Sequence, residues 1–292
     1  MANTDLIKKL RDLTQAGVMD AKKALDETND DIDAAIQWLR EKGIAKAAKK
    51  ESALATEGIA NVIVKDNDAL ILEVNSQTDF VAGNENFMQL VDGISNTLIT
   101  SKVKTIEEAL QTKIANGSTI DYACKEITGR IGEKIALRRF SILSKEKNQT
   151  FAHYQHSNKK IAVLLLFNGT INEQLGKDIA MHAAAMAPKF LNEKEVDQEW
   201  LNNEKKILTE QTIAEGKPAE RAEMIVQGRV NKLLSEVTLV NQQFVKDQSK
   251  KINQLLKENN VDLLKYIRYE VGEGIEKQVV DFAAEVAEQM KK

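Results

Sequence analysis

Apolar residues in positions 1–43 recur with the period of an α-helix. The recurrence is interrupted at Gly17 and again at Asn29 and Asp30, which are residue types that end or cap helices. We therefore expect three short helices that pack against one another, with Gly43 as the stop signal of the third. A unit of about 40 residues has little core left to build a cleft, so docking is its expected role. Residues 44–57 carry several lysines and alanines and predict a basic helical linker.

After residue 57 the pattern changes to alternation with period 2, which is typical of strands. Residues 59–65 and 69–75 predict two strands joined by the polar turn 66–68. Further strands are expected at 134–144, 150–156, 161–168 and 263–271, and helices at 85–99, 105–115, 119–129, 171–187 and 249–259. These elements form two strand–helix blocks, and each block predicts a small antiparallel sheet with helices on one face.

Two long helical patterns flank Gly216 and Pro218, and they predict an antiparallel helical hairpin inserted into the second block. The predicted fold class is therefore α+β. We divide the chain into a ubiquitin-associated-like three-helix bundle (1–43), a basic linker (44–57), a core N-subdomain (58–140), a core C-subdomain (141–189 and 238–272), the helical hairpin (190–237) and a C-terminal helical module (273–292).

Composition excludes several classes of partner. Lys and Arg number 41 against 44 Asp and Glu, a formal charge of -3, which argues against direct binding of nucleic acid. The longest apolar run, residues 161–167, is too short to span a bilayer, and charges come too early in the chain for a signal sequence. We expect a cytoplasmic protein that binds neither nucleic acid nor membranes.

The sequence contains no P-loop, dinucleotide-binding, metalloprotease or Cys-x-x-Cys motif, so we expect a protein without catalytic residues, metal or cofactor. His153 and His156 would face opposite sides of a strand, which suits a shared metal ion poorly. Cys124 and His182 are interpreted as packed side chains. An enzyme that uses Cys124 as a nucleophile with His153 is kept as an alternative.

Residues 75–84 place Phe80 and Val81 in a polar loop directly after a buried strand. Two interpretations are open. Either the loop folds its Phe80 ring back into the core, or the ring is an apolar wedge, held next to the carboxylate of Asp79, that inserts into a partner protein.

Ordered segments spread over the whole chain carry a family resemblance: LRDLTQAGVMDAKKAL near the start, ILEVNSQTDFVA at 71–82, IGEKIALRR at 131–139, YQHSNKKIAVLL at 154–165, IAMHAAAMAP at 179–188, GKPAERAEMIVQGRV at 216–230 and YIRYEVGEGIEK at 266–277. In these segments the chain resembles the bacterial elongation factor Ts family. Its members are nucleotide exchange factors for elongation factor Tu, the GTPase of translation elongation.

The resemblance implies a guanine-nucleotide exchange factor that acts by binding. It would bind elongation factor Tu with GDP, displace Mg²⁺ and promote GDP release so that GTP can bind. The element that family members insert into the GTPase domain matches Thr78, Asp79, Phe80 and Val81. Further partner contacts are implied at Met19, Lys23, Ile131, Gly132, His156 and Phe282. Gly83 stands where the family commonly has a lysine, and the hairpin mediates self-association in some members.

A rival from another class is a non-catalytic adaptor that binds a ubiquitin-like protein or RNA through the N-terminal bundle and the lysines of 46–50. An adaptor of that kind would not accelerate GDP release from the GTPase, so a release assay separates the two interpretations.

Overall fold

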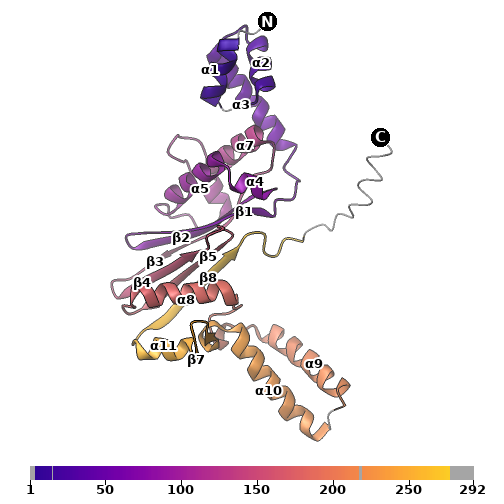
Figure 1. The fold of residues 1–292 in the computed structure, drawn as a ribbon, viewed down its shortest axis with the longest axis vertical. Coiled ribbons are helices and arrows are strands. Elements are labelled where there is room, and N and C mark those ends of the chain that lie inside the picture. The colour runs from indigo at the N-terminus through magenta and orange to yellow at the C-terminus, as the bar shows by residue number, and fades with distance from the viewer. Residues whose placement is uncertain (1–3, 15, 217–218, 277–292) are drawn as a thin grey trace.

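A computed structural model describes residues 4–14, 16–216 and 219–276 of the chain. The described part is elongated, with a helical bundle at one end, a helical hairpin at the other and a layered α+β core between them (Figure 1). The fold class is the one the sequence predicts. Within the described residues, the helices are all too short or too polar to cross a membrane.

The N-terminal bundle consists of α1 (Thr4–Thr14), α2 (Val18–Glu27) and α3 (Ile32–Ala48). Its core contains the fully buried residues Leu10, Ala21, Ala24, Leu25 and Ala35. Capping of α3 by Asn29 or Asp30 was wrong, because both residues adopt positive φ angles and form the preceding turn. Asp31 caps the helix instead, and its carboxylate accepts a hydrogen bond of 3.0 Å from the Ala34 N–H.

The sequence predicts that α3 stops at Gly43, but the helix continues to Ala48. Gly43 lies inside the helix where α3 crosses α7 (Ile120–Ile131) of the core, and a Cβ built on Gly129 would lie 2.5 Å from the Gly43 Cα atom. The close approach of the two helix backbones therefore requires a glycine at position 129, and Gly43 does not end α3. Of the predicted helical linker, only the first residues are helical, and residues 49–56 form turns and irregular chain.

The N-subdomain contains an antiparallel sheet in the order β1–β2–β3 with helices on one face. Its strands are β1 (Glu57–Lys65), β2 (Asp68–Ser76) and β3 (Ala136–Ser144). The covering helices are α4 (Asp79–Ala82), α5 (Glu85–Leu98), α6 (Ile106–Gln111) and α7. Leu70, Leu72 and Val74 of β2 pack against α5 and α7 around the buried ring of Phe87.

The C-subdomain repeats this plan with the sheet order β4–β5–β8, which is also antiparallel. Its strands are β4 (Gln149–Gln155), β5 (Ile161–Asn168) and β8 (Asp262–Glu270). The helices α8 (Glu173–Met186) and α11 (Ile252–Glu258) complete its core, with a small ribbon of β6 (Gln243–Phe244) and β7 (Asp247–Lys251). A helix is expected from Ser249 onward, but Ser249 lies in β7, where its side chain hydrogen-bonds Asp247, and the helix begins at Ile252.

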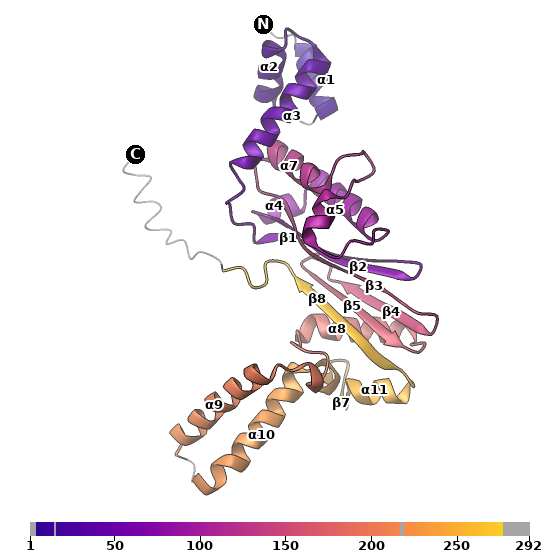
Figure 2. The ribbon, with the colours of Figure 1, turned by 180° about the vertical axis from the view of Figure 1, so that it is seen from behind.

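The two sheets pack against each other, which the sequence analysis did not predict. Ala69 and Ile71 on the second face of β2 meet Ala162 and Leu164 on the second face of β5. The core is therefore a stack of helices, sheet, sheet and helices, and Figure 2 shows the two sheets together with α8 on the outer face of the second. Because β2 and β5 are covered on both faces, each is apolar along nearly its whole length.

The inserted hairpin is formed by α9 (Gln198–Ala214) and α10 (Ala219–Val237), and it projects from the core as predicted (Figure 1). Thr212 of α9 and Val226 and Val230 of α10 are buried along it. Gly216 adopts a φ of 72° just after the end of α9, which suits a glycine that terminates a helix, and Pro218 lies outside the described residues. The predicted C-terminal module (273–292) also lies outside them from residue 277 onward.

A buried carboxylate joins the two subdomains beside the linker. Glu73 of β2 is completely buried, and its oxygens accept hydrogen bonds from Arg138 (3.0 Å), Arg139 (2.6 Å) and the Gly272 N–H (2.9 Å). An irregularity in the pairing of β2 with β3 after Glu73 accompanies the placement of both arginines on it. Gly272 also packs against the Thr56 carbonyl, where a Cβ atom would not fit. The linker and the turn after β8 are therefore held together.

Candidate protein-binding site

The most exposed large apolar side chain described in the core is that of Phe80, which is 88% accessible to solvent. It lies on α4, a helix of four residues that directly follows β2. The next residue, Val81, is 6% exposed and belongs to the hydrophobic core of the N-subdomain. The interpretation in which the Phe80 ring folds back into the core is therefore wrong. The buried side chain of Val81 anchors the backbone of α4, whereas the side chain of Phe80 next to it points into solvent.

A second segment is hydrogen-bonded to the start of α4. The helix α7 ends at Gly132, whose left-handed conformation (φ 85°) turns the chain toward β3. Glu133 then accepts hydrogen bonds from the Thr78 N–H (3.0 Å) and the Thr78 hydroxyl (2.8 Å). The Lys134 N–H donates to the Gln77 side-chain oxygen at 2.9 Å. The structure thus places the predicted contacts Ile131 and Gly132 beside Thr78 and Asp79.

The predicted contact His156 lies in the turn between β4 and β5, and this turn of the C-subdomain docks on β1 of the N-subdomain. The Ala60 N–H donates to the Lys159 carbonyl at 2.8 Å, and the Lys160 ammonium pairs with Glu57 at 2.7 Å. The hydrogen bond to Glu57 raises the pKa of Lys160, and the negative charge of Asp79 acts in the same direction. His156 itself is half-buried.

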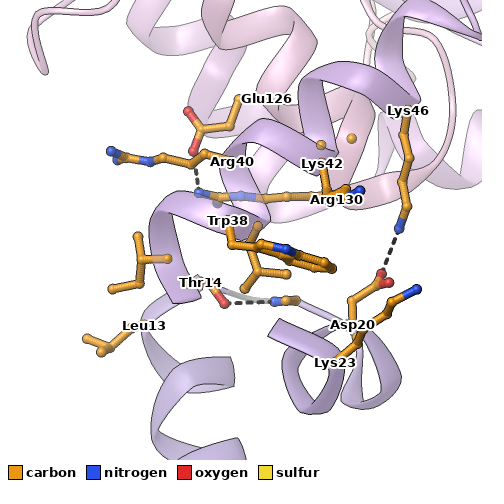
Figure 3. Close-up of a pocket in the computed structure, with 16 residues that line it drawn as sticks. Leu13, Thr14, Asp20, Lys23, Trp38, Arg40, Lys42, Lys46, Glu126 and Arg130 are labelled. Carbon is orange, nitrogen blue, oxygen red and sulfur yellow. Dashed lines mark hydrogen bonds and ion pairs between the residues drawn. The ribbon is translucent and has the colours of Figure 1, made fainter. Parts of the chain in front are cut away.

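The bundle presents a separate surface. Met19 at the start of α2 is 75% exposed, and Leu13 and Val18 are also exposed. Figure 3 shows Lys23 at the edge of a cleft between the bundle and α7, next to an ion pair of 2.9 Å between Asp20 and Lys46. Met19 and Lys23 thus lie on the bundle, apart from Phe80 and the other predicted contacts of the core. Phe282, the remaining predicted contact, lies outside the described residues.

The alternative nucleophile is contradicted by its surroundings. Cys124 is buried in α7, and burial raises the pKa of its thiol to about 12. Such a thiol is protonated and inaccessible at neutral pH, so it does not attack a substrate. His182 is a packed, hydrogen-bonded side chain, as expected, since its Nε2 lies 2.9 Å from the Gln242 side-chain oxygen. Within the described ranges, no three His, Cys, Asp or Glu side chains gather as metal ligands would.

Sequence reasoning missed Glu133, Glu57 and Lys160, the charged residues that hold the exposed elements in place. Glu133 stands 55 positions after Thr78, and Lys160 stands 103 positions after Glu57. No periodicity within an element relates residues at such separations.

The exposed apolar side chains of Phe80 and Met19 on this layered fold are typical of a protein that binds another protein. A family model described as elongation factor TS matches residues 77–273. A protein named elongation factor Ts from Malacoplasma penetrans (strain HF-2) is 47% identical over 291 residues, which cover 99% of each chain. The chain belongs to the elongation factor Ts family. This membership implies a nucleotide exchange factor of translation elongation.

Proposed function

We propose that this chain is a cytoplasmic exchange factor that binds GDP-bound elongation factor Tu, displaces Mg²⁺ and promotes GDP release so that GTP can bind. One observation carries the proposal. The ring of Phe80 is 88% exposed on a short helix whose backbone is anchored to the core, so it is available to a partner. Exposure of a large aromatic side chain next to a carboxylate, Asp79, is typical of a binding element.

The four residues of the inserted element then have different tasks. Phe80 and Asp79 are exposed and form the part that enters the partner. Val81 is buried in the protein's own core, and Thr78 is bound by Glu133, so these two hold the element in position. Because α4 is already ordered in the free protein, little conformational entropy is lost on binding.

The energetics follow from linkage. A protein that binds nucleotide-free GTPase better than the GDP-bound form weakens GDP binding by the same factor. Burial of the Phe80 ring contributes roughly 2–3 kcal/mol, and this is gained only when the partner opens to admit it. Displacement of the partner's Mg²⁺ removes positive charge from the diphosphate and favours its release. No covalent step is required of this chain.

The other contacts support the same partner from two directions. Ile131, Gly132 and the His156 turn lie near α4 and extend the surface around Phe80. Met19 and Lys23 lie on the bundle, at a distance from that surface, and would contact a second part of the partner (Figure 1). We propose that the two regions bind the same GTPase together. The hairpin lies at the far end of the molecule and is proposed as a surface for self-association.

The proposal is tested with Phe80→Ala in an assay of fluorescent GDP release from elongation factor Tu. We expect an efficiency roughly thirtyfold lower, because a central aromatic anchor contributes about 2 kcal/mol or more. The melting temperature should stay close to that of the parent, since the ring is exposed. Met224→Ala is the matched control, because Met224 is 71% exposed but lies on the hairpin. Parental GDP release from Phe80→Ala would refute the proposal.

A further inference from the structure

We propose that Glu133 is a positioning residue for nucleotide exchange: it fixes the start of α4 and thereby aims the Phe80 ring at the partner. The inference deepens the proposed function and rests on it. Glu133 does not need to touch the partner in order to act, because its carboxylate is already engaged by Thr78.

The helix α4 cannot hold its own geometry. It has four residues, and a helix of one turn is unstable by itself because nucleation is costly. Thr78 stands at its N-cap position, but the Thr78 side chain makes no capping hydrogen bond to the helix. The direction of α4 therefore depends on hydrogen bonds from outside it and on the burial of Val81.

Thr78 is held through each of its polar groups. The N–H donates to Glu133 Oε2 at 3.0 Å, and the single hydroxyl proton is shared between the two carboxylate oxygens, which lie 2.8 and 3.0 Å from the hydroxyl oxygen. The Thr78 carbonyl accepts a hydrogen bond of 2.9 Å from the hydroxyl of the buried residue Ser76. The two donors of Thr78 thus both bind one carboxylate, and hydrogen bonds to a charged group are stronger than those between neutral groups. Glu133 thus fixes the residue that lies two positions before Phe80.

Glu133 is itself on a fixed segment, so it can act as a reference point. The Gly132 N–H donates to the Thr128 carbonyl at 2.8 Å, and the Ile135 N–H donates to the Thr128 hydroxyl at 3.0 Å. Lys134 is bound to Gln77 at 2.9 Å, which provides a parallel second connection between the same two segments. Any displacement of Thr78 would therefore have to break hydrogen bonds to a turn that α7 and β3 hold on both sides.

The experiment measures GDP release with Glu133→Ala, with and without Phe80→Ala. We expect Glu133→Ala to lower the efficiency about tenfold in the parent, because hydrogen bonds to a charged group are lost. In the Phe80→Ala background the same change should cost less than about twofold, because no ring remains to be aimed. Glu133→Gln keeps an acceptor for Thr78 and should stay within about threefold of the parent. Glu107→Ala, an exposed glutamate on α6, is the matched control.

Amide hydrogen exchange gives a readout that does not depend on the partner. The Thr78 amide should exchange about tenfold faster in Glu133→Ala than in the parent, because its acceptor is removed. If Glu133→Ala fails to fold, Thr78→Val, which removes only the hydroxyl, is compared with and without Phe80→Ala in the same way.

The outcomes separate the inference from the function on which it rests. An equal loss in both backgrounds, or parental release by Glu133→Ala, would overturn the positioning role and leave the Phe80 proposal intact. Parental release from Phe80→Ala alone would overturn the proposed function and this inference with it. A loss confined to the background that contains Phe80, together with faster exchange at Thr78, supports the role of Glu133.

Discussion

The crossing of α3 and α7 allows a substitution whose effect can be worked out from the coordinates. In Gly129→Ala the new Cβ would lie 2.5 Å from the Cα and carbonyl oxygen of Gly43. Non-bonded carbon atoms are comfortable at about 3.5–4.0 Å, so the two helices must separate by roughly 1 Å. Overpacking of this kind costs about 1–3 kcal/mol, and the better helix propensity of alanine returns about 1 kcal/mol of that cost. We expect a net loss of up to about 2 kcal/mol in the free energy of unfolding.

The reciprocal substitution is the matched control. A Cβ on Gly43 would meet the Gly129 Cα at 3.7 Å, which is an ordinary contact, so Gly43→Ala should be neutral or stabilise by up to about 1 kcal/mol. Gly93→Ala, in the interior of α5 with open space around it, calibrates the propensity term alone.

The measurement uses the intrinsic fluorescence of the bundle. The chain has two tryptophans, so in a Trp200→Phe background Trp38 of α3 reports urea unfolding of the bundle by itself. Gly129→Ala should shift the midpoint to lower urea, and Gly43→Ala should not. Gly129→Ala should also lower the efficiency of nucleotide exchange, because Met19 and Lys23 move with the bundle. Equal destabilisation by the two substitutions would refute the asymmetric crossing described above.

Two further predictions concern the C-subdomain and the hairpin inserted into it. The buried His182 donates from Nε2 to Gln242 and accepts from the Val245 N–H on Nδ1, and burial lowers its pKa. Because the unfolded histidine titrates near its ordinary value of about 6.5 and binds a proton more readily, the parent should lose stability as pH falls below that value. In urea titrations between pH 7 and 5, the free energy of unfolding of the parent should fall by up to about 1.4 kcal/mol per pH unit more than that of His182→Gln. Equal pH dependence of the two proteins would contradict this role of His182. Replacement of residues 203–231 by a short glycine-containing turn should leave GDP release unchanged, since the proposed contacts lie elsewhere, and should abolish any dimer seen by sedimentation. Slower release from a folded variant would contradict this placement.

The elements themselves could be predicted because each is encoded locally. The alternation of residues 59–65 and 69–75 and the helical stripes of the bundle are visible in the sequence, and β1, β2 and α1 to α3 are found there. Local signals failed where a tertiary contact gives a residue another use. Gly43 carries the signal of a helix end, but it lies inside α3, at the place where this helix crosses α7 beside Gly129. Ser249 is of a residue type that often caps helices, but it belongs to a β-ribbon.

The site was predictable in part. The position of Phe80 in a polar segment left two interpretations open, because exposure depends on which neighbour, Phe80 or Val81, faces the core. A one-turn helix has no periodicity from which this can be read. Glu133 was not predictable, because a hydrogen bond between residues 55 positions apart depends on the path of the chain between them.

The place of β8 in its sheet has a consequence for synthesis on the ribosome. β5 is the central strand of the C-subdomain, but its second neighbour begins about ninety residues after β5 ends, with the whole hairpin between them. At a synthesis rate of about 5–20 residues per second, one edge of β5 stays unpaired for roughly 5–20 seconds before β8 is made. During that interval an apolar strand presents unpaired N–H and C=O groups, which is the condition that favours pairing with another chain. Glu73 also lacks its bond to Gly272 until the same moment. The strand β8 therefore completes the sheet of the C-subdomain, and the turn after it then connects that sheet to Glu73 of the N-subdomain.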